Sequence, residues 1–325
     1  RLLLQLKRVL EQGKQSVLFL NRRGFSSFVV CKSCGDVPEC PNCSVSLTHY
    51  RRTDSLQCHY CGYDTTMAQT CAKCGSPEFS FGGLGTESLE MEIAQAFPEA
   101  RLLRIDREST QKKGTLEIKL RAIAKGECDI VIGTQMIAKG HDFPNVALAA
   151  IVNADVSLNV PDFRASERAH QLFTQVAGRA GRAGTVGTVV LQTYSPDHPA
   201  IRHAQAGTFD EFCREELELR QAFKYPPFFR LARILVTNAS DARARDVSRE
   251  IAQILQAFPL VDVEILGPAP AVIHKILNKF RWNILIKAKT ATGLNALLKS
   301  LSPTCRALAR TGGHISIDVD PVSLL

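Results

Sequence analysis

Eight of the chain's 11 cysteines lie within one stretch of 44 residues, arranged as four Cys-x-x-Cys pairs. Such a pair lets two thiolates from one tight turn bind the same metal ion, and two pairs complete a tetrahedral structural zinc site. The four pairs therefore predict two closed zinc sites. They are Cys31/Cys34, Cys40/Cys43, Cys58/Cys61 and Cys71/Cys74.

Two alternatives would use the same cysteines. A disulfide framework requires an oxidising compartment, and the first residues of the chain carry no secretory signal. A redox protein needs one reactive dithiol, and four pairs exceed that requirement. The spacing therefore favours zinc.

The lengths of the connecting segments indicate how the pairs combine. Zinc ribbons usually separate their two knuckles by about a dozen residues or more. Between Cys43 and Cys58 there are 14 residues, whereas between Cys34 and Cys40 there are only five. A nested arrangement is therefore expected, in which one ion takes Cys40, Cys43, Cys58 and Cys61 and the other takes Cys31, Cys34, Cys71 and Cys74. Since eight thiols fill two tetrahedra, His49 and His59 are expected to be surface residues and not ligands.

The length of the chain and its charge limit the class of protein. A chain of 325 residues can form two or three domains. The formal net charge of +8 suits a polyanionic partner, nucleic acid first. No apolar run is long enough to span a membrane, so no membrane partner is expected.

Short apolar strands alternate with helical patterns on both sides of the cysteine segment. This alternation is typical of a parallel sheet covered by helices. Because the pattern resumes after Cys74, the cysteine segment is expected to be an insertion into one α/β domain. The predicted strands are 16–20, 101–105, 129–132, 146–152 and 187–193, and the predicted helices are 2–10, 89–97, 116–125 and 164–179.

A second domain is expected after a helical connector. Its pattern is strand, helix, strand, strand, helix, strand, which is the split arrangement of ferredoxin-like domains. The domains expected are an α/β domain at 1–30 and 75–195, an inserted double zinc module at 31–74, a connector at 196–225 and a C-terminal βαββαβ domain at 226–325.

Two loops of the α/β domain carry candidate chemistry. Arg179 and Arg182 lie three residues apart on one helical face, and Gly178 before them and Gly181 between them allow close approach. Guanidinium groups suit the charge on a transferring γ-phosphoryl group, although a basic helix end would look similar. The other loop, from Gly133 to Phe143, follows a strand and offers hydroxyl, amide, Lys and Asp groups, as ligand-binding βα loops do. An ordinary βα loop is the alternative.

These loops resemble motifs V and VI of superfamily 2 helicases. The Thr opening and Gly-x-Asp close of motif V are matched by Thr134, Gly140 and Asp142, and the Gln-x-x-Gly-Arg-x-Gly-Arg form of motif VI by Gln175, Gly178, Arg179, Gly181 and Arg182. The segments FLNRRGFS, GTE, RIDRES, IGTQMIAKGHDFPNV, DFRASERAHQLFTQVAGRAGRAG and IDVDPV, together with the cysteine array, are similar to the PriA family (primosomal protein N′) of bacterial replication-restart helicases. The resemblance covers essentially the whole chain.

The resemblance implies a second RecA-like helicase lobe within an ATP-driven 3′→5′ DNA helicase that binds stalled forks and assembles a primosome. It implies that Gln175, Arg179 and Arg182 take part in ATP hydrolysis, with both arginines reaching the γ-phosphate of ATP. Gly140, Asp142 and Gly178 would line the nucleotide, with Asp142 at the ribose. The residues expected to contact DNA are Thr134, Lys139, Arg22, Arg23, Lys279, Arg281 and Trp282.

For the C-terminal residues among these, charge combined with a stacking ring suits nucleic acid. A core position is the alternative for Trp282. The partners implied are forked and single-stranded DNA, single-stranded DNA-binding protein and other primosome proteins, in the bacterial cytoplasm at the nucleoid.

The chain shows no Gly-x-x-x-x-Gly-Lys-Ser/Thr loop and no Asp-Glu box after an apolar strand. It is therefore expected to be the C-terminal half of such an enzyme, inactive alone, with ATP and Mg²⁺ held in the complete protein. The competing hypothesis is a non-catalytic, zinc-stabilised DNA-binding or docking module.

Overall fold

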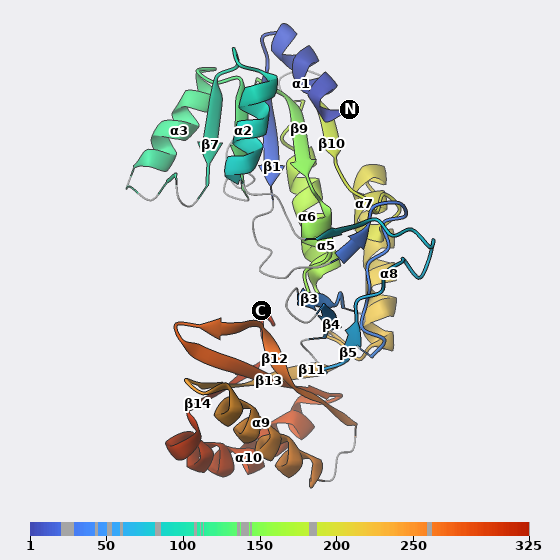
Figure 1. Ribbon diagram of the computed structural model, residues 1–325, viewed down its shortest axis with the longest axis vertical. Helices are drawn as coiled ribbons and strands as arrows, with labels where there is room; N and C mark the ends of the chain where they lie inside the picture. The colour runs from blue at the N-terminus through green and yellow to red at the C-terminus, as the bar shows by residue number, and fades with distance from the viewer. Residues whose placement is uncertain are drawn as a thin grey trace.

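The computed structural model describes residues 1–325 apart from 21–28, 43–44, 51–53, 59–60, 82–85, 107–108, 111, 113, 135–136, 138–142, 144, 182–186, 259–261 and 325. The described part of the chain forms a five-stranded parallel sheet, a four-stranded antiparallel sheet, and two small antiparallel sheets formed by segments on either side of and within the cysteine array. Figure 1 shows β3, β4 and β5 lying between the two larger sheets.

The parallel sheet has the strand order β10-β9-β1-β8-β7. Its central strands are buried along their whole length and, apart from Gln15 and Ser16 at the start of β1, consist of apolar residues and glycine, as expected for strands covered on both faces. The strands are β1 (Gln15–Leu20), β7 (Leu102–Ile105), β8 (Ile130–Gly133), β9 (Val146–Val152) and β10 (Thr188–Leu191).

Helices cover both faces of this sheet. One face packs against α3 (Thr115–Ala124) and α6 (Ala165–Ala177), which contribute Ile123 and Phe173 to the same core as Val17 and Val131. The other face packs against α1 (Leu2–Glu11) and α2 (Thr86–Ala96). The short helix α5 (Asp155–Leu158) leads towards α6. The α/β domain with a parallel sheet that the alternating pattern predicted is confirmed.

The cysteine segment leaves and rejoins the α/β domain through one pair of strands. β2 (Val29–Cys31) pairs antiparallel with β6 (Phe79–Phe81), so the two ends of the segment lie side by side. Within the segment, β3 (Thr48–Tyr50), β4 (Ser55–Gln57) and β5 (Asp64–Thr66) form a small antiparallel sheet. The strand pair is the geometry that an insertion requires.

Two helices, α7 (Pro199–Ala206) and α8 (Phe209–Ala222), lead to the four-stranded sheet. Its elements follow the predicted order, and its strands are arranged β12-β13-β11-β14. The two helices of this domain, Asp241–Gln256 and Ala291–Gly312, pack on one face of the sheet. The elements are β11 (Arg230–Asn238), α9 (Asp241–Gln256), β12 (Val263–Ile276), β13 (Lys279–Ala288), α10 (Ala291–Gly312) and β14 (His314–Val319).

The other face of this sheet meets the cysteine segment. Leu231, Leu266 and Leu285 share a buried cluster with Cys40 and Cys58. The same cluster contains the stacked rings of Phe163 and Tyr225, whose centroids are 4.6 Å apart. The cysteine segment therefore contributes to the contact between the two larger sheets. In the part of the chain that the structure describes, no helix is long and apolar enough to cross a membrane.

Candidate functional site

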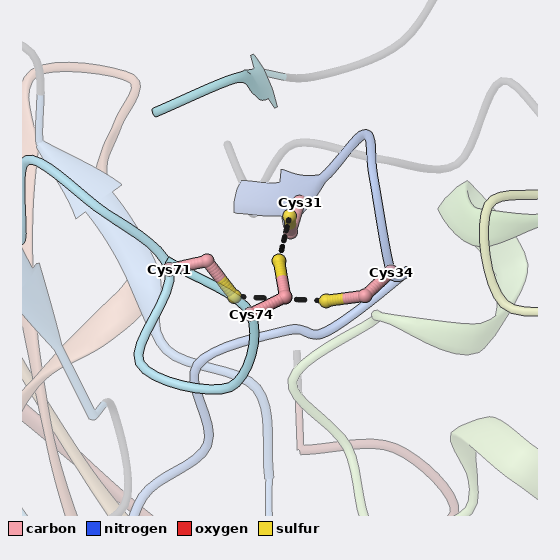
Figure 2. Close-up of side chains that lie close together, drawn as sticks. All are labelled: Cys31, Cys34, Cys71 and Cys74. Atoms are coloured by element: carbon pink, nitrogen blue, oxygen red, sulfur yellow. Dashed lines mark hydrogen bonds between the residues drawn. The ribbon is translucent and has the colours of Figure 1, made fainter. Parts of the chain in front are cut away.

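Four cysteines from the two ends of the inserted segment converge on one point. The sulfur atoms of Cys31, Cys34, Cys71 and Cys74 all lie within 4.8 Å of one another. Figure 2 shows the four side chains pointing toward one another. The sulfurs of Cys31 and Cys74 are 3.6 Å apart, as are those of Cys34 and Cys71. We call this group the outer cluster.

A second group, the inner cluster, lies in the interior of the segment. It contains Cys40, Cys58 and Cys61, whose sulfurs also lie within 4.8 Å of one another. The sulfurs of Cys40 and Cys61 are 3.5 Å apart. The fourth predicted member, Cys43, lies outside the described residues. Both groups match the nested combination that the segment lengths indicated.

The sulfur distances fit a tetrahedral zinc site. With Zn–S bonds of about 2.3 Å, the sulfurs of a regular tetrahedron lie about 3.8 Å apart. A disulfide would require about 2.05 Å between sulfurs, and the described cysteines are thiols. The donor set therefore suits a structural zinc ion and not a disulfide framework.

Backbone hydrogen bonds shape three of the four knuckles in the same way. In the first, Gly35 N–H donates to the Cys31 carbonyl at 2.9 Å, and Cys31 N–H donates to the Asp36 carbonyl at 2.8 Å. The knuckles that begin at Cys58 and Cys71 repeat both bonds. In all three, a glycine with positive φ follows the second cysteine, where larger residues are disfavoured. These glycines are Gly35, Gly62 and Gly75.

Local donors also prepare a thiolate. Although burial raises the pKa of Cys31, hydrogen bonds from the backbone of Cys34 and Ser33 outweigh it, and the pKa is lowered to about 7. Since zinc binds the thiolate form, this lowering favours metal binding at Cys31. At Cys34 a hydrogen bond from the Asp36 backbone lowers the pKa, but burial and the three neighbouring thiols outweigh it and raise the pKa to about 12.

His49 is not the surface residue that the sequence suggested. Only 7% of it is exposed, because it stands on β3 with its ring 4.9 Å from that of Phe81. Its Nε2 atom lies 2.9 Å from a carboxylate oxygen of Asp54. His49 belongs to neither cysteine cluster, and His59 lies outside the described residues.

The motif VI segment ends α6. Gln175 is exposed on the last turn, Gly178 caps the helix, and Arg179 is half-buried just beyond it. Gly181 and Gly187 approach each other so closely that a Cβ on Gly187 would lie 2.2 Å from the Gly181 nitrogen. Arg182 lies outside the described residues. The glycines here let one stretch of backbone pass close to another.

The motif V segment begins at the opposite edge of the sheet and ends near motif VI. Thr134 follows the carboxyl end of β8, half-buried, and its N–H donates to the Ile105 carbonyl. The segment ends at the start of β9, where Val146 N–H donates to Phe143 and the Val146 carbonyl accepts from Gly181 N–H. The two motifs therefore meet at the amino end of β9. Lys139, Gly140 and Asp142 lie outside the described residues, as do Arg22 and Arg23, which follow β1.

One carboxylate at the carboxyl edge of the sheet was not singled out by sequence reasoning. Asp106, fully buried after β7, accepts hydrogen bonds from the Thr86 hydroxyl at 2.9 Å and the Ser109 N–H at 2.7 Å. Burial raises its pKa, but these donors and the Arg104 guanidinium outweigh burial and lower it. Its place at a strand end in the RIDRES segment is the signal that could have identified it.

The predicted C-terminal DNA residues differ in exposure. Lys279 is exposed, whereas Arg281 is partly buried and donates to the Ile273 carbonyl at 3.2 Å. Trp282 is also partly buried, and its indole N–H donates to Asp241 at the start of α9 at 2.8 Å. This placement favours the core alternative for Trp282 over a stacking platform.

Three family models match separate parts of the chain. They are described as helicase conserved C-terminal domain (residues 85–184), PriA DNA helicase Cys-rich region domain (residues 40–65) and primosomal protein N C-terminal domain (residues 221–322).

Alignments with curated relatives cover almost the whole chain. Replication restart protein PriA of Bacillus subtilis is 42% identical over 99% of this chain and 40% of its own length. The PriA proteins of Haemophilus influenzae and Treponema pallidum are 41% and 39% identical over 99% and 100% of the chain, and 44% and 49% of their own lengths. The chain therefore spans less than half the length of these relatives.

Among solved structures, the yeast DEAD-box splicing factor Prp28 is similar with a TM-score of 0.27 and 15% identity, over 44% of this chain and 30% of that one. That likeness is too low to support an argument. The three family models and the relatives, which match the chain over nearly its whole length, all indicate the same family. The chain belongs to the PriA family of replication restart proteins and corresponds to their C-terminal half.

Proposed function

We propose that the chain is the C-terminal half of an ATP-dependent 3′→5′ DNA helicase that recognises stalled replication forks and restarts replication by primosome assembly. The observation that carries the proposal is the meeting of the motif V and motif VI segments at the amino end of β9. A module that only binds DNA has no need for an arginine-bearing helix end at that place. ATP and Mg²⁺ would be held chiefly by another lobe of the full-length protein.

The proposed roles divide between the two ends of the strands in the parallel sheet. At the edge where β9 begins, Gln175, Arg179 and Arg182 would contact the γ-phosphate, while Asp142, with Gly140 and Gly178, would line the nucleotide. At the edge where β1 and β8 end, Arg22, Arg23 and Thr134 would contact DNA, with Lys139 following in the same loop. The order of residues along the segments supports this division.

We further propose that each cysteine cluster binds one structural zinc ion, with Cys43 completing the inner set. When bound, zinc cross-links the segment ends and adds folding free energy. The strand order β12-β13-β11-β14 supports a ferredoxin-like C-terminal domain beside the helicase lobe, the inserted module and the connector. Proposed partners are forked and single-stranded DNA, single-stranded DNA-binding protein and primosome proteins, in the cytoplasm at the nucleoid.

Arg179→Ala in the full-length protein tests the motor assignment. We expect steady-state ATP hydrolysis on forked DNA to fall by about 10³-fold, because an arginine that stabilises the transferring phosphoryl group contributes that much. DNA binding should persist. Arg202→Ala provides the control, since Arg202 is an exposed arginine that pairs with Glu215 on the connector. Unchanged ATP hydrolysis in Arg179→Ala would favour the alternative, a non-catalytic docking module.

A further inference from the structure

The C-terminal domain carries an unbroken positive segment. From Ile265 to Ile317 the chain contains no Asp or Glu, so all 32 of its acidic residues lie outside this segment. The same segment holds eight basic residues, as many as the formal net charge of the whole chain. They are Lys275, Lys279, Arg281, Lys287, Lys289, Lys299, Arg306 and Arg310; of these, Lys287 is buried and donates to the Phe223 carbonyl at 2.8 Å. A segment of this kind attracts a polyanion.

Within this segment, the hairpin between β12 and β13 ends in an apolar residue. Ile276 pairs with Lys279, and Leu277 and Asn278 form the two-residue turn between them. Leu277 is 91% exposed, the highest value among the large apolar side chains that the structure describes. The exposed side chains of Lys275 and Lys279 flank it, one on each strand. The tip therefore combines one apolar group with two cations.

The turn does not require leucine. Leu277 and Asn278 have φ values of 47° and 60°, so both lie in the left-handed region that two-residue hairpin turns use. Asparagine and glycine adopt this conformation readily, whereas a bulky side chain does so at a cost. Neither the backbone nor solvation thus favours leucine at this position. A ligand that covers the side chain would account for it.

The base of the hairpin is fixed to the domain. Asp241, at the start of α9, accepts from the Trp282 indole N–H and lies 2.9 Å from Nε2 of His274. The Lys275 ammonium lies over the Phe280 ring at 4.8 Å. Because these contacts hold both strands of the hairpin, the position of the turn relative to the domain is fixed.

We propose that this hairpin inserts Leu277 between bases where duplex DNA meets a single strand, while Lys275 and Lys279 bind the flanking phosphates. Leucine is among the apolar side chains that unstack base steps when cationic groups hold the backbone on either side. The absence of carboxylates from 265 to 317 favours DNA over a protein partner. The inference rests on the proposed function, in which the chain binds forked DNA, and it names a residue of the C-terminal domain that would contact the bases.

The test places 2-aminopurine, a base whose fluorescence rises when it unstacks, at the last base pair before a single-stranded arm. The zinc-loaded chain should raise its fluorescence. Leu277→Asn suits the turn conformation, so it should fold at least as well, and circular dichroism checks this. We expect this variant to lose the fluorescence rise and to bind the junction about tenfold more weakly. Its affinity for single-stranded DNA should be unchanged.

Two further variants distinguish the insertion of Leu277 between bases, which we call the wedge, from general DNA binding. Ile118→Gln removes another exposed apolar side chain, 68% exposed on α3, and should behave as the unmodified chain does. Lys275→Gln combined with Lys279→Gln should weaken binding to all DNA and reduce the slope of log affinity against log salt by about two.

The outcomes distinguish two failures. If the unmodified chain shows no salt-dependent DNA binding, the proposed binding of forked DNA fails, and the insertion of Leu277 fails with it. If the chain binds DNA but Leu277→Asn keeps the full fluorescence rise, the wedge alone is wrong. Loss of the rise in Leu277→Asn, with binding to single strands retained, supports the proposal.

Discussion

The two cysteine clusters share their donor chemistry but differ in what surrounds them. The inner cluster is embedded, since Cys40 and Cys58 pack with Leu231 and Leu285 of the C-terminal sheet. The outer cluster has one knuckle against the helicase lobe and the other open to solvent, where Cys74 is exposed. The comparison indicates that the inner cluster supports the contact between domains, whereas the outer cluster fastens the insertion to its own lobe.

The glycines of the knuckles show the same difference at atomic scale. A Cβ on Gly35 would lie 2.0 Å from the Tyr194 carbonyl oxygen, and one on Gly62 would lie 3.6 Å from the Pro268 carbonyl oxygen. A Cβ on Gly75 would meet nothing within 4 Å. One sequence pattern is thus used in a tight contact with the lobe, in a looser contact with the C-terminal domain, and in open solvent.

The largest difference is expected from removing a ligand of each cluster. Cys58→Ser should lower the free energy of unfolding by more than about 3 kcal/mol, because a buried site loses its ion and its packing together. Cys74→Ser should cost less, because its surroundings are solvent. Elemental analysis should give about two zinc ions for the unmodified chain and about one for each variant, and urea unfolding gives the free energies. Equal losses of stability would contradict the comparison.

In the full-length protein, Cys58→Ser should also impair unwinding or primosome assembly more than ATP hydrolysis. The insertion leaves and rejoins through β2 and β6, so the parallel sheet can form without it. Parallel assays of hydrolysis and unwinding measure the difference. A collapse of hydrolysis while the lobe stays folded would place the insertion in the nucleotide site.

The next effect concerns alanine at the knuckle glycines. Gly35→Ala should destabilise by about 3 kcal/mol or more, because the new methyl group meets backbone that cannot move away. Gly75→Ala should cost only about 1 kcal/mol, the penalty of positive φ for a residue with a Cβ. Thermal unfolding in the presence of zinc compares the two, and similar values would show that the lobe yields at Tyr194.

The smallest effect separates a hydrogen bond to the lobe from one within the outer cluster. The Ser195 hydroxyl donates to the Gly35 carbonyl at 2.7 Å, while the exposed Ser33 hydroxyl donates to Ser76 at 2.8 Å. Ser195→Ala should cost about 1 kcal/mol. Ser33→Ala should stay within about 0.5 kcal/mol, as surface changes usually do. Denaturant midpoints measure both, and the reverse order would count against the attachment of the first knuckle to the lobe.

The features that the sequence predicted are those that depend on a local pattern of residues. Apolar runs predicted the strands, and the numbers of residues between cysteine pairs predicted which pairs would meet. The remainder depends on contacts between distant segments. The burial of His49 follows from its contact with Phe81, and the requirement for glycine at Gly35 follows from Tyr194, far along the chain. A pattern read along one segment does not contain those partners.

The helix α6 links two distant parts of the protein. Near its first residue, buried Asp162 accepts from the backbone N–H of Leu324, and Arg164 donates to the Pro321 carbonyl, so the chain after β14 is tied there. Just beyond its last residue stands Arg179. A helix of 13 residues is a stiff rod about 20 Å long, so a tilt of about 3° at one end moves the other by about 1 Å. Since a misplacement of about 1 Å can cost roughly a hundredfold in rate, small rotations of the C-terminal domain would be enough to set the position of that arginine.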